Sequence, residues 1–281
     1  MLEAEAAIAP QAWRVEFAEG ARIAPDGGDA ITISEPRSVT AVLTPLATSD
    51  ALAEVSPQTA GALIVIWMPP GANTPATIER DVDEWVRGAG TERKEANARA
   101  DVRTLRVAWG RNRTVVYANE GDVRLALDAI LRFSLAQRET LALNAAMRSM
   151  WPSIEADATF THALTPRDRK KQPHINEMTV TVTRMKIAWL RLKASLEQVD
   201  PALAEPSKRL FAELAAAVFL YDQVDVLGPK VQFALDHYEI ANTRLIDMTL
   251  VRQERIESIA GYGMIIVLLV FQTWLIFQDL W

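Results

Sequence analysis

Few side chains in this sequence could carry out chemistry, because the residue types that catalysis and metal binding need are scarce. The 281 residues include no Cys and three His, at His162, His174 and His237. Without Cys there are no disulfides, thiolate nucleophiles, Fe–S clusters or Cys-ligated zinc sites. The sequence also lacks the phosphate-binding loop, the HExxH metalloprotease motif, the nucleophile elbow and the calcium-binding loop. We therefore expect neither a metal ion nor a cofactor.

An enzyme would have to use charged side chains of the N-terminal region. The candidates form an acidic group and a basic group: Asp81, Asp83, Glu84, Arg106, Arg111 and Arg113. The acidic residues fit equally well in the first turns of a helix, where the helix dipole favours negative charge. His237, next to Asp236, is predicted to be a solvent-exposed residue of a later helix. We predict that the protein is not an enzyme.

The densest charge is a basic cluster formed by Arg167, Arg169, Lys170 and Lys171, which Asp168 partly offsets. Such a cluster is typical of a solvated loop, and the same charges could contact anionic lipid, rRNA or an acidic protein partner. The whole chain carries 30 basic and 36 acidic side chains, a net charge of −6. It therefore offers no global basic field, and we expect no DNA binding.

A long apolar segment lies near the C-terminal end of the sequence. Residues 258–278 contain no formally charged side chain, and a bilayer core of ~30 Å needs about 20 mainly apolar residues in a helix. Tyr262 and Trp274 stand near its two ends, where aromatic rings settle at membrane interfaces. Because the segment is apolar on every face, we predict a transmembrane helix rather than a buried core helix. Among its polar residues, Gln272 either contacts a neighbouring helix within the membrane or is a tolerated polar residue.

The charges around this segment predict its orientation. Arg244, Arg252 and Arg255 precede it and Asp279 follows it, and basic flanks stay on the cytoplasmic side. Residues 1–6 lack the positive and apolar regions of a signal peptide. We therefore predict a single-pass, tail-anchored protein of the inner (cytoplasmic) membrane, with the N-terminal body in the cytoplasm and the lipid bilayer as one partner.

The body that precedes the span is predicted to have an α+β fold. Alternating or β-branched runs predict strands at residues 13–17, 30–34, 38–43, 62–68, 102–109 and 114–118. The unbroken apolar run at 62–68 is typical of a buried central strand. A short helix is predicted at 78–86 and a loop at 88–99. Residues 1–121 are thus expected to form a sheet-containing head.

A helical period begins at residue 122 and predicts three further parts: a helical domain at 122–228, a stalk helix at 229–258 and a transmembrane helix at 259–278. The first helix should end before Pro152, a second should begin near Asn176, and a third, from 208 to 227, should end at Gly228-Pro229.

The stalk carries an apolar stripe at three-four spacing: Tyr238, Ala241, Leu245 and Met248. We expect this stripe to pack either against the chain's own helical domain or, as a coiled coil, against a neighbouring copy or partner.

Two families resemble this chain. Tyr238-Glu-Ile-Ala-Asn-Thr-Arg-Leu245, followed by the apolar residues 264–269, resembles the Asn-x-Arg-Leu stretch and C-terminal span of the "required for meiotic nuclear division" family. That resemblance implies a non-enzymatic tether or assembly factor, linked in mitochondria to translation. Tyr262-Gly-Met264 is similar to part of the selectivity motif of CorA-type cation transporters, which also place an α/β head on a long stalk helix.

These observations together predict a membrane tether, scaffold or assembly factor that acts through its cytoplasmic domain. We expect it to form a homo-oligomer or to join a membrane-associated protein complex. The alternative is an oligomeric, CorA-like pore or a transport-related membrane protein.

Overall fold

The computed structural model divides into two compact units. It describes residues 9–19, 29–48, 51, 62–69, 82, 84–86, 97–162, 164–165, 167–198, 200–201 and 203–279, with side chains up to residue 274. The sheet unit comprises residues 1–145 and 187–228, and the helical unit comprises residues 146–186 and 229–281.

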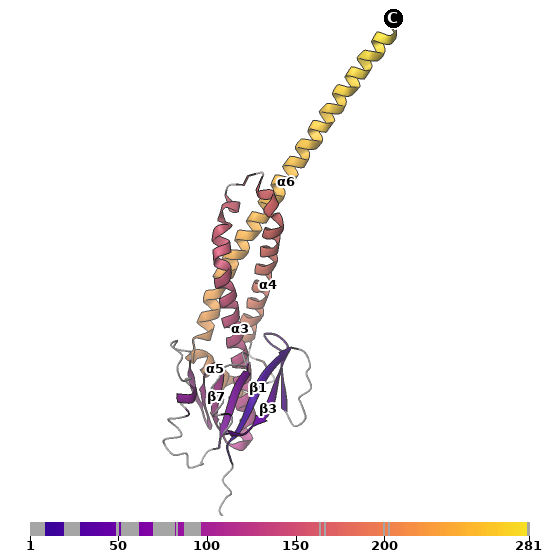
Figure 1. Cartoon of the computed structure of the whole chain (residues 1–281). Helices are drawn as coiled ribbons and strands as arrows, with labels where there is room; N and C mark the ends of the chain where they lie inside the picture. Colours follow the sequence, from indigo (N-terminus) through magenta and orange to yellow (C-terminus); the bar gives the residue numbers. More distant parts are fainter. Residues whose placement is uncertain are drawn as a thin grey trace, which may run out of the picture. The chain divides into compact units, whose positions relative to one another are not determined.

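A seven-stranded mixed sheet forms the centre of the sheet unit (Figure 1). Its strands are β1 (Gln11–Glu19), β2 (Asp29–Ile33), β3 (Val39–Leu46), β4 (Ala62–Met68), β5 (Ala98–Val102), β6 (Leu105–Trp109) and β7 (Arg113–Tyr117). Their order is β2-β3-β1-β4-β7-β6-β5, with β4 and β7 parallel and the other neighbours antiparallel. β4 is the middle strand and is buried from Leu63 to Met68, as its apolar run predicts.

Apolar side chains cover both faces of the sheet. On one face Trp109 of β6 meets Phe133 of α3 (Val123–Ala156) edge to face at 4.8 Å, and Phe133 meets Phe211 of α5 (Glu205–Ala217) at 6.3 Å. The Trp109 indole also donates a 2.9 Å hydrogen bond to Ser134. The other face carries Ile66 and Trp85 in a separate core cluster. The α+β fold with a sheet-containing head is thus confirmed.

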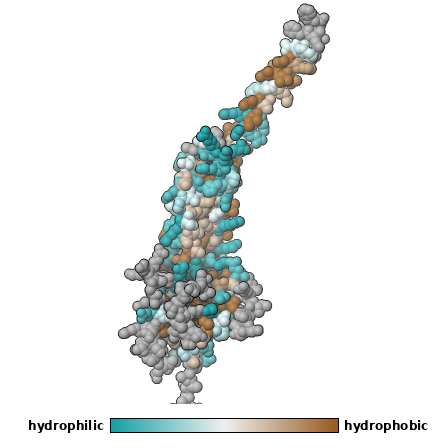
Figure 2. Space-filling view, in the orientation of Figure 1, coloured by the Kyte–Doolittle hydropathy of each residue, from teal (hydrophilic) through white to brown (hydrophobic). Residues whose placement is uncertain are grey.

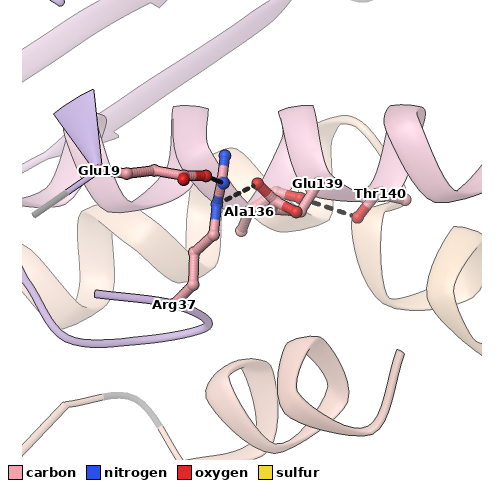
Figure 3. A network of polar contacts seen from close by, with 5 residues as sticks. All are labelled: Glu19, Arg37, Ala136, Glu139 and Thr140. Atoms are coloured by element: carbon pink, nitrogen blue, oxygen red, sulfur yellow. Dashed lines mark hydrogen bonds and ion pairs between the residues drawn. The ribbon is translucent and has the colours of Figure 1, made fainter. Parts of the chain in front are cut away.

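A polar network links a strand end, a turn and α3 (Figure 3). Arg37 bridges Glu19 of β1 and Glu139 of α3, with 2.8 Å between Arg37 Nε and the Glu139 carboxylate. Thr140 donates to the Ala136 carbonyl one turn earlier. Because Arg37 and Glu19 are largely exposed, this network positions the turn and adds little stability.

The strands differ from expectation at one place. The predicted strand 102–109 is two strands, because Arg103 adopts a left-handed backbone (φ 55°) and turns the chain back between β5 and β6. β5 begins within the predicted loop, and most of it was not predicted as a strand, because its inward-facing residues are only Ala98, Ala100 and Val102, a weak apolar signal. Of the predicted helix 78–86, residues 82 and 84–86 are helical; its other residues, and 88–96 of the predicted loop, lie outside the described residues.

Two predicted helix boundaries are wrong near prolines. α3 continues through Pro152 to Ala156, because the buried side chains of Met150 and Ile154 on either side hold the turn in place. Likewise α6 (Leu220–Asp279) contains Pro229 and does not begin there. The chain breaks earlier instead, at Val218 and Phe219.

The break between α5 and α6 has a defined geometry. Phe219 is left-handed (φ 55°), and the Gln223 side chain donates a 2.7 Å hydrogen bond to the Val218 carbonyl. This is a helix C-terminus of the kind that usually uses Gly. The fourth long helix, α4, runs from Gln172 to Glu197, so it begins one turn before the predicted Asn176.

Candidate membrane-proximal site

The C-terminal part of α6 is a candidate membrane span. Among the described residues, one helix is long and apolar enough to cross a membrane, and none of its apolar window is buried by protein. Hydrophobic side chains follow one another along this part of the helix (Figure 2). A helix with water-exposed apolar residues on all sides is unstable in water, so these residues require lipid or another protein around them.

Polar residues in the candidate span either bond to their own helix or are exposed on its surface. The Thr273 hydroxyl donates to the Leu269 carbonyl of its own helix, and hence needs no partner. Gln272 is exposed on the helix surface. Tyr262, from the Tyr-Gly-Met stretch, is exposed as well.

The apolar stripe of the stalk lies inside the chain's own helical packing. Tyr238, Ala241 and Leu245 are completely buried, whereas Met248 is half-buried. The first of the two alternatives, intramolecular packing, therefore describes the three buried residues. They are not available to a partner as long as the helical unit stays folded.

A polar cluster around the buried Asp157 connects the end of α3 to α4 and α6; its His174 side chain is about half exposed. The Asp157 carboxylate, 6% exposed, lies 2.8 Å from Nε2 of His174 and accepts a 3.2 Å hydrogen bond from the Tyr238 hydroxyl. Burial, assisted by the Asp157 charge and hydrogen bond, raises the pKa of Tyr238 above its ordinary value. Tyr238 is therefore a neutral donor at any physiological pH, and the cluster joins α3, α4 and α6.

His237 is buried and not at the surface, contrary to prediction. Its ring stacks on Phe233 (6.2 Å between centroids) and meets Tyr238 edge to face, so aromatic packing outweighs the polarity of the ring. Burial lowers its pKa, against the opposing effect of Asp157. Nε2 of His237 has no hydrogen-bond partner within the described part of the chain.

A second polar contact ties the start of α4 to α6. Gln172 donates to the Asn242 side chain at 2.6 Å and to Asn176 at 2.9 Å. Asn242 and Leu245 belong to the Asn-x-Arg-Leu stretch, so two of its three named residues hold the helical unit together.

The basic cluster occupies the turn that leads into α4. All four of its side chains are exposed, and Asp168–Lys171 form a short 3-10 helix. Asp168 accepts hydrogen bonds from the backbone and hydroxyl of Thr165, which lower its pKa. Lys171 lies 4.6 Å from the Phe160 ring centroid. Asp168 thus stabilises the turn, and its neighbours present their charges to the surroundings.

A groove of about 500 Å³ lies beside the start of the candidate span. It brings one residue of the basic cluster together with one face of α6. Its lining residues are Arg169, Met248, Thr249, Val251, Arg252, Arg255, Ile256 and Ile259. Arg252 and Arg255 entered the sequence argument only as flanking charges, because no local pattern shows that a turn some 80 positions earlier approaches them.

The charged residues considered for an enzyme have other contacts. Arg106 pairs with Asp101 at 3.0 Å, and Arg113 donates to the Trp85 carbonyl at 2.9 Å. Glu84 is exposed, and residues 81 and 83 lie outside the described part. Within that part, no group of three or more His, Cys, Asp or Glu side chains could hold a metal ion.

No protein-family model and no curated protein matches the chain. The fold and the membrane-proximal geometry define it as an α+β protein with one C-terminal helix suited to membrane association.

Proposed function

We propose that the protein is a non-enzymatic tether, scaffold or assembly factor, held at the inner membrane by α6 with its folded body in the cytoplasm. One observation carries the proposal: the exposed apolar part of α6 is continuous with the helix whose earlier residues pack inside the helical unit. A body joined to its anchor without a flexible linker is suited to holding a partner near the membrane.

The charges near the span support this orientation. Arg252 and Arg255 precede the apolar segment, and Arg169 of the basic cluster lines the same groove. Basic residues within 15–20 residues of a span favour the cytoplasmic side. Arg169 lies far from the span in the sequence, so it adds positive charge beside the span through its position in space alone.

A partner or second copy would dock on the exposed apolar side chains of the helical unit. The ring centroids of Trp151 in α3 and Phe233 in α6 lie 5.9 Å apart, and both side chains are at least a third exposed. Ile240, seven residues after Phe233, is about half exposed. Exposed aromatic side chains of this kind are enriched in protein interfaces.

The experiment has two parts, both on the full chain in its native membranes. Alkaline carbonate extraction and protease accessibility test the anchor: the protein should stay in the pellet, and its body should be cleaved only when the cytoplasmic face is open. A photo-crosslinking amino acid at Phe233 should then give one adduct of discrete mass, whereas the same probe at the exposed Glu213 of α5 should give none. Release by carbonate, or identical adducts at both positions, contradicts the proposal.

The adduct mass separates the tether from the pore-like alternative. A ladder of self-adducts together with ion flux in reconstituted vesicles, abolished by Gln272→Leu, would favour a CorA-like pore. Exposure of Gln272 on the candidate span is the observation that favours this second candidate.

A further inference from the structure

We propose that the groove beside the start of the span binds an anionic phospholipid from the leaflet that the body faces. The lipid phosphate contacts the arginines, and the part of an acyl chain nearest the headgroup lies on the apolar floor of the groove. The inference rests on the membrane anchoring proposed above. It adds a defined ligand site to an otherwise unspecific anchor.

The charges of the groove suit an anion. Three arginines, Arg169, Arg252 and Arg255, line it, and no lining residue is acidic. Within the described part of the chain, none of their side chains forms an ion pair or hydrogen bond. Guanidinium groups bind phosphate with two parallel hydrogen bonds, so three of them around one groove match a lipid phosphate.

The acidic residues of this helix segment lie elsewhere. At 3.6 residues per turn, Met248, Arg252, Arg255 and Ile259 share one face of α6, whereas Glu254 and Glu257 fall on the opposite face. Glu257 accepts a 3.0 Å hydrogen bond from Gln253. The acid nearest to Arg169 in the sequence, Asp168, is held by Thr165. These acidic side chains therefore do not neutralise the arginines that line the groove.

The apolar lining suits a lipid better than a soluble phosphate compound. Met248, Val251, Ile256 and Ile259 contribute its floor, and Ile259 already belongs to the uncharged segment. Arg255 precedes that segment by three residues, or ~5 Å along the helix. This is the depth of phosphate groups at a bilayer surface.

The test uses the full chain in detergent micelles and native mass spectrometry to count bound lipids. Phosphatidylglycerol and phosphatidylcholine are titrated separately, with inorganic phosphate as competitor. We expect the wild type to retain phosphatidylglycerol preferentially. A basic residue close to anionic lipid contributes about 1 kcal/mol, or about fivefold in affinity, so Arg252→Gln/Arg255→Gln should weaken retention by about 25-fold.

Two matched controls separate a groove from diffuse positive charge. Lys170→Gln removes an exposed charge adjacent to Arg169 in the chain that does not line the groove, so it should have a much smaller effect than Arg169→Gln. Arg184→Gln/Lys230→Gln removes two exposed charges of the same unit, and should leave retention within about twofold of the wild type. Melting temperatures verify that each variant is folded.

Three outcomes overturn the inference: equal retention of both lipids, equal effects of Arg169→Gln and Lys170→Gln, or full displacement of lipid by inorganic phosphate. The last outcome would assign the groove to a soluble phosphate compound. Carbonate extraction of the Arg252→Gln/Arg255→Gln variant keeps the two proposals apart. The variant should stay in the membrane although it has lost its lipid preference. A wild-type protein that stays in the membrane without any lipid preference contradicts only the groove, whereas release of the wild type contradicts the anchor itself.

Discussion

The indole of Trp189 in α4 occupies the space that a β-carbon on Gly228 of α6 would fill. Such a carbon would lie 2.5 Å from Cζ2 of the ring. The indole Nε1 also donates a 2.8 Å hydrogen bond to the Val224 carbonyl, one turn before Gly228. Gly228 is therefore required for the close approach of two helices, and the adjacent Pro229 lies within a continuous helix.

Gly228→Ala should destabilise the fold. Alanine gains up to about 1 kcal/mol of helix propensity, but the added carbon must displace a ring held by a hydrogen bond, which costs roughly 1–3 kcal/mol. We expect a net loss of about 1 kcal/mol, measured by denaturant unfolding in detergent. Gly121→Ala, where the added carbon meets nothing within 4 Å, is the control. In a Trp189→Ala background the loss should vanish, and a loss of unchanged size there would disprove the ring contact.

Phe219→Gly should stabilise the protein. Phe219 is left-handed and 67% exposed, so glycine relieves about 1–2 kcal/mol of backbone strain and gives up little burial. After the greater flexibility of glycine in the unfolded chain is subtracted, we expect a gain of up to about 1 kcal/mol in the same unfolding assay. Phe233→Gly, inside α6, should destabilise the protein; a loss at both positions would contradict the assigned break.

Leu245→Ala should cost 2–5 kcal/mol, because a fully buried leucine leaves a cavity. Ile240→Ala, on the exposed side of the same helix, should cost less than about 1 kcal/mol. Unfolding curves give both values, and light scattering on the folded variants reports assembly. If Leu245→Ala changed the assembly state at unaltered stability, the stripe would serve association and not the helical unit.

Tyr238→Phe should destabilise the helical unit by about 1.5–3 kcal/mol, the net value of one hydrogen bond to a charged group such as the buried Asp157 carboxylate. Tyr221→Phe serves as the control, because no hydrogen bond of its hydroxyl links it to another described residue. Hydrogen exchange measured at the end of α3 should accelerate in the first variant alone. Equal exchange in both variants would show that the Asp157 cluster does not hold this end.

The pKa of His237 predicts a loss of stability in acid. Burial lowers this pKa below the ordinary value of 6.5, so below pH 6.5 the unfolded chain takes up a proton that the folded chain does not. The contribution of neutral His237 to the free energy of unfolding should be fully present above pH 6.5. It should fall as the pH decreases towards the pKa of His237 in the folded protein, by at most about 1.4 kcal/mol per pH unit.

His237→Phe preserves the stacking on Phe233 but cannot take up a proton, so its melting temperature should depend less on pH between 8 and 5 than that of the wild type. His162→Gln removes an exposed ring whose charge contributes to the lowered pKa of His237 after burial, so it should change the pH dependence less than His237→Phe does. Parallel curves for wild type and His237→Phe would rule out His237 as the cause.

The sequence alone determined the features that depend on neighbouring residues. The uncharged segment 258–278, the central run that became β4, the hairpin between β6 and β7 and the existence of the long helices all follow from local periodicity, because burial repeats every two residues in a strand and every 3.6 in a helix. The helix end predicted at Gly228-Pro229 was wrong, because the glycine there makes room for the ring of Trp189, 39 positions earlier, and does not end the helix.

Only the tertiary structure decided which side chains meet. Asp157, His174 and Tyr238 lie far apart in sequence, and none stands at a spacing that predicts the others. The same holds for Arg169 and Arg252, which line one groove although 82 residues separate them. Contacts of this kind arise when helices pack to bury apolar surface, and a polar side chain then finds whichever partner that packing brings within hydrogen-bond distance.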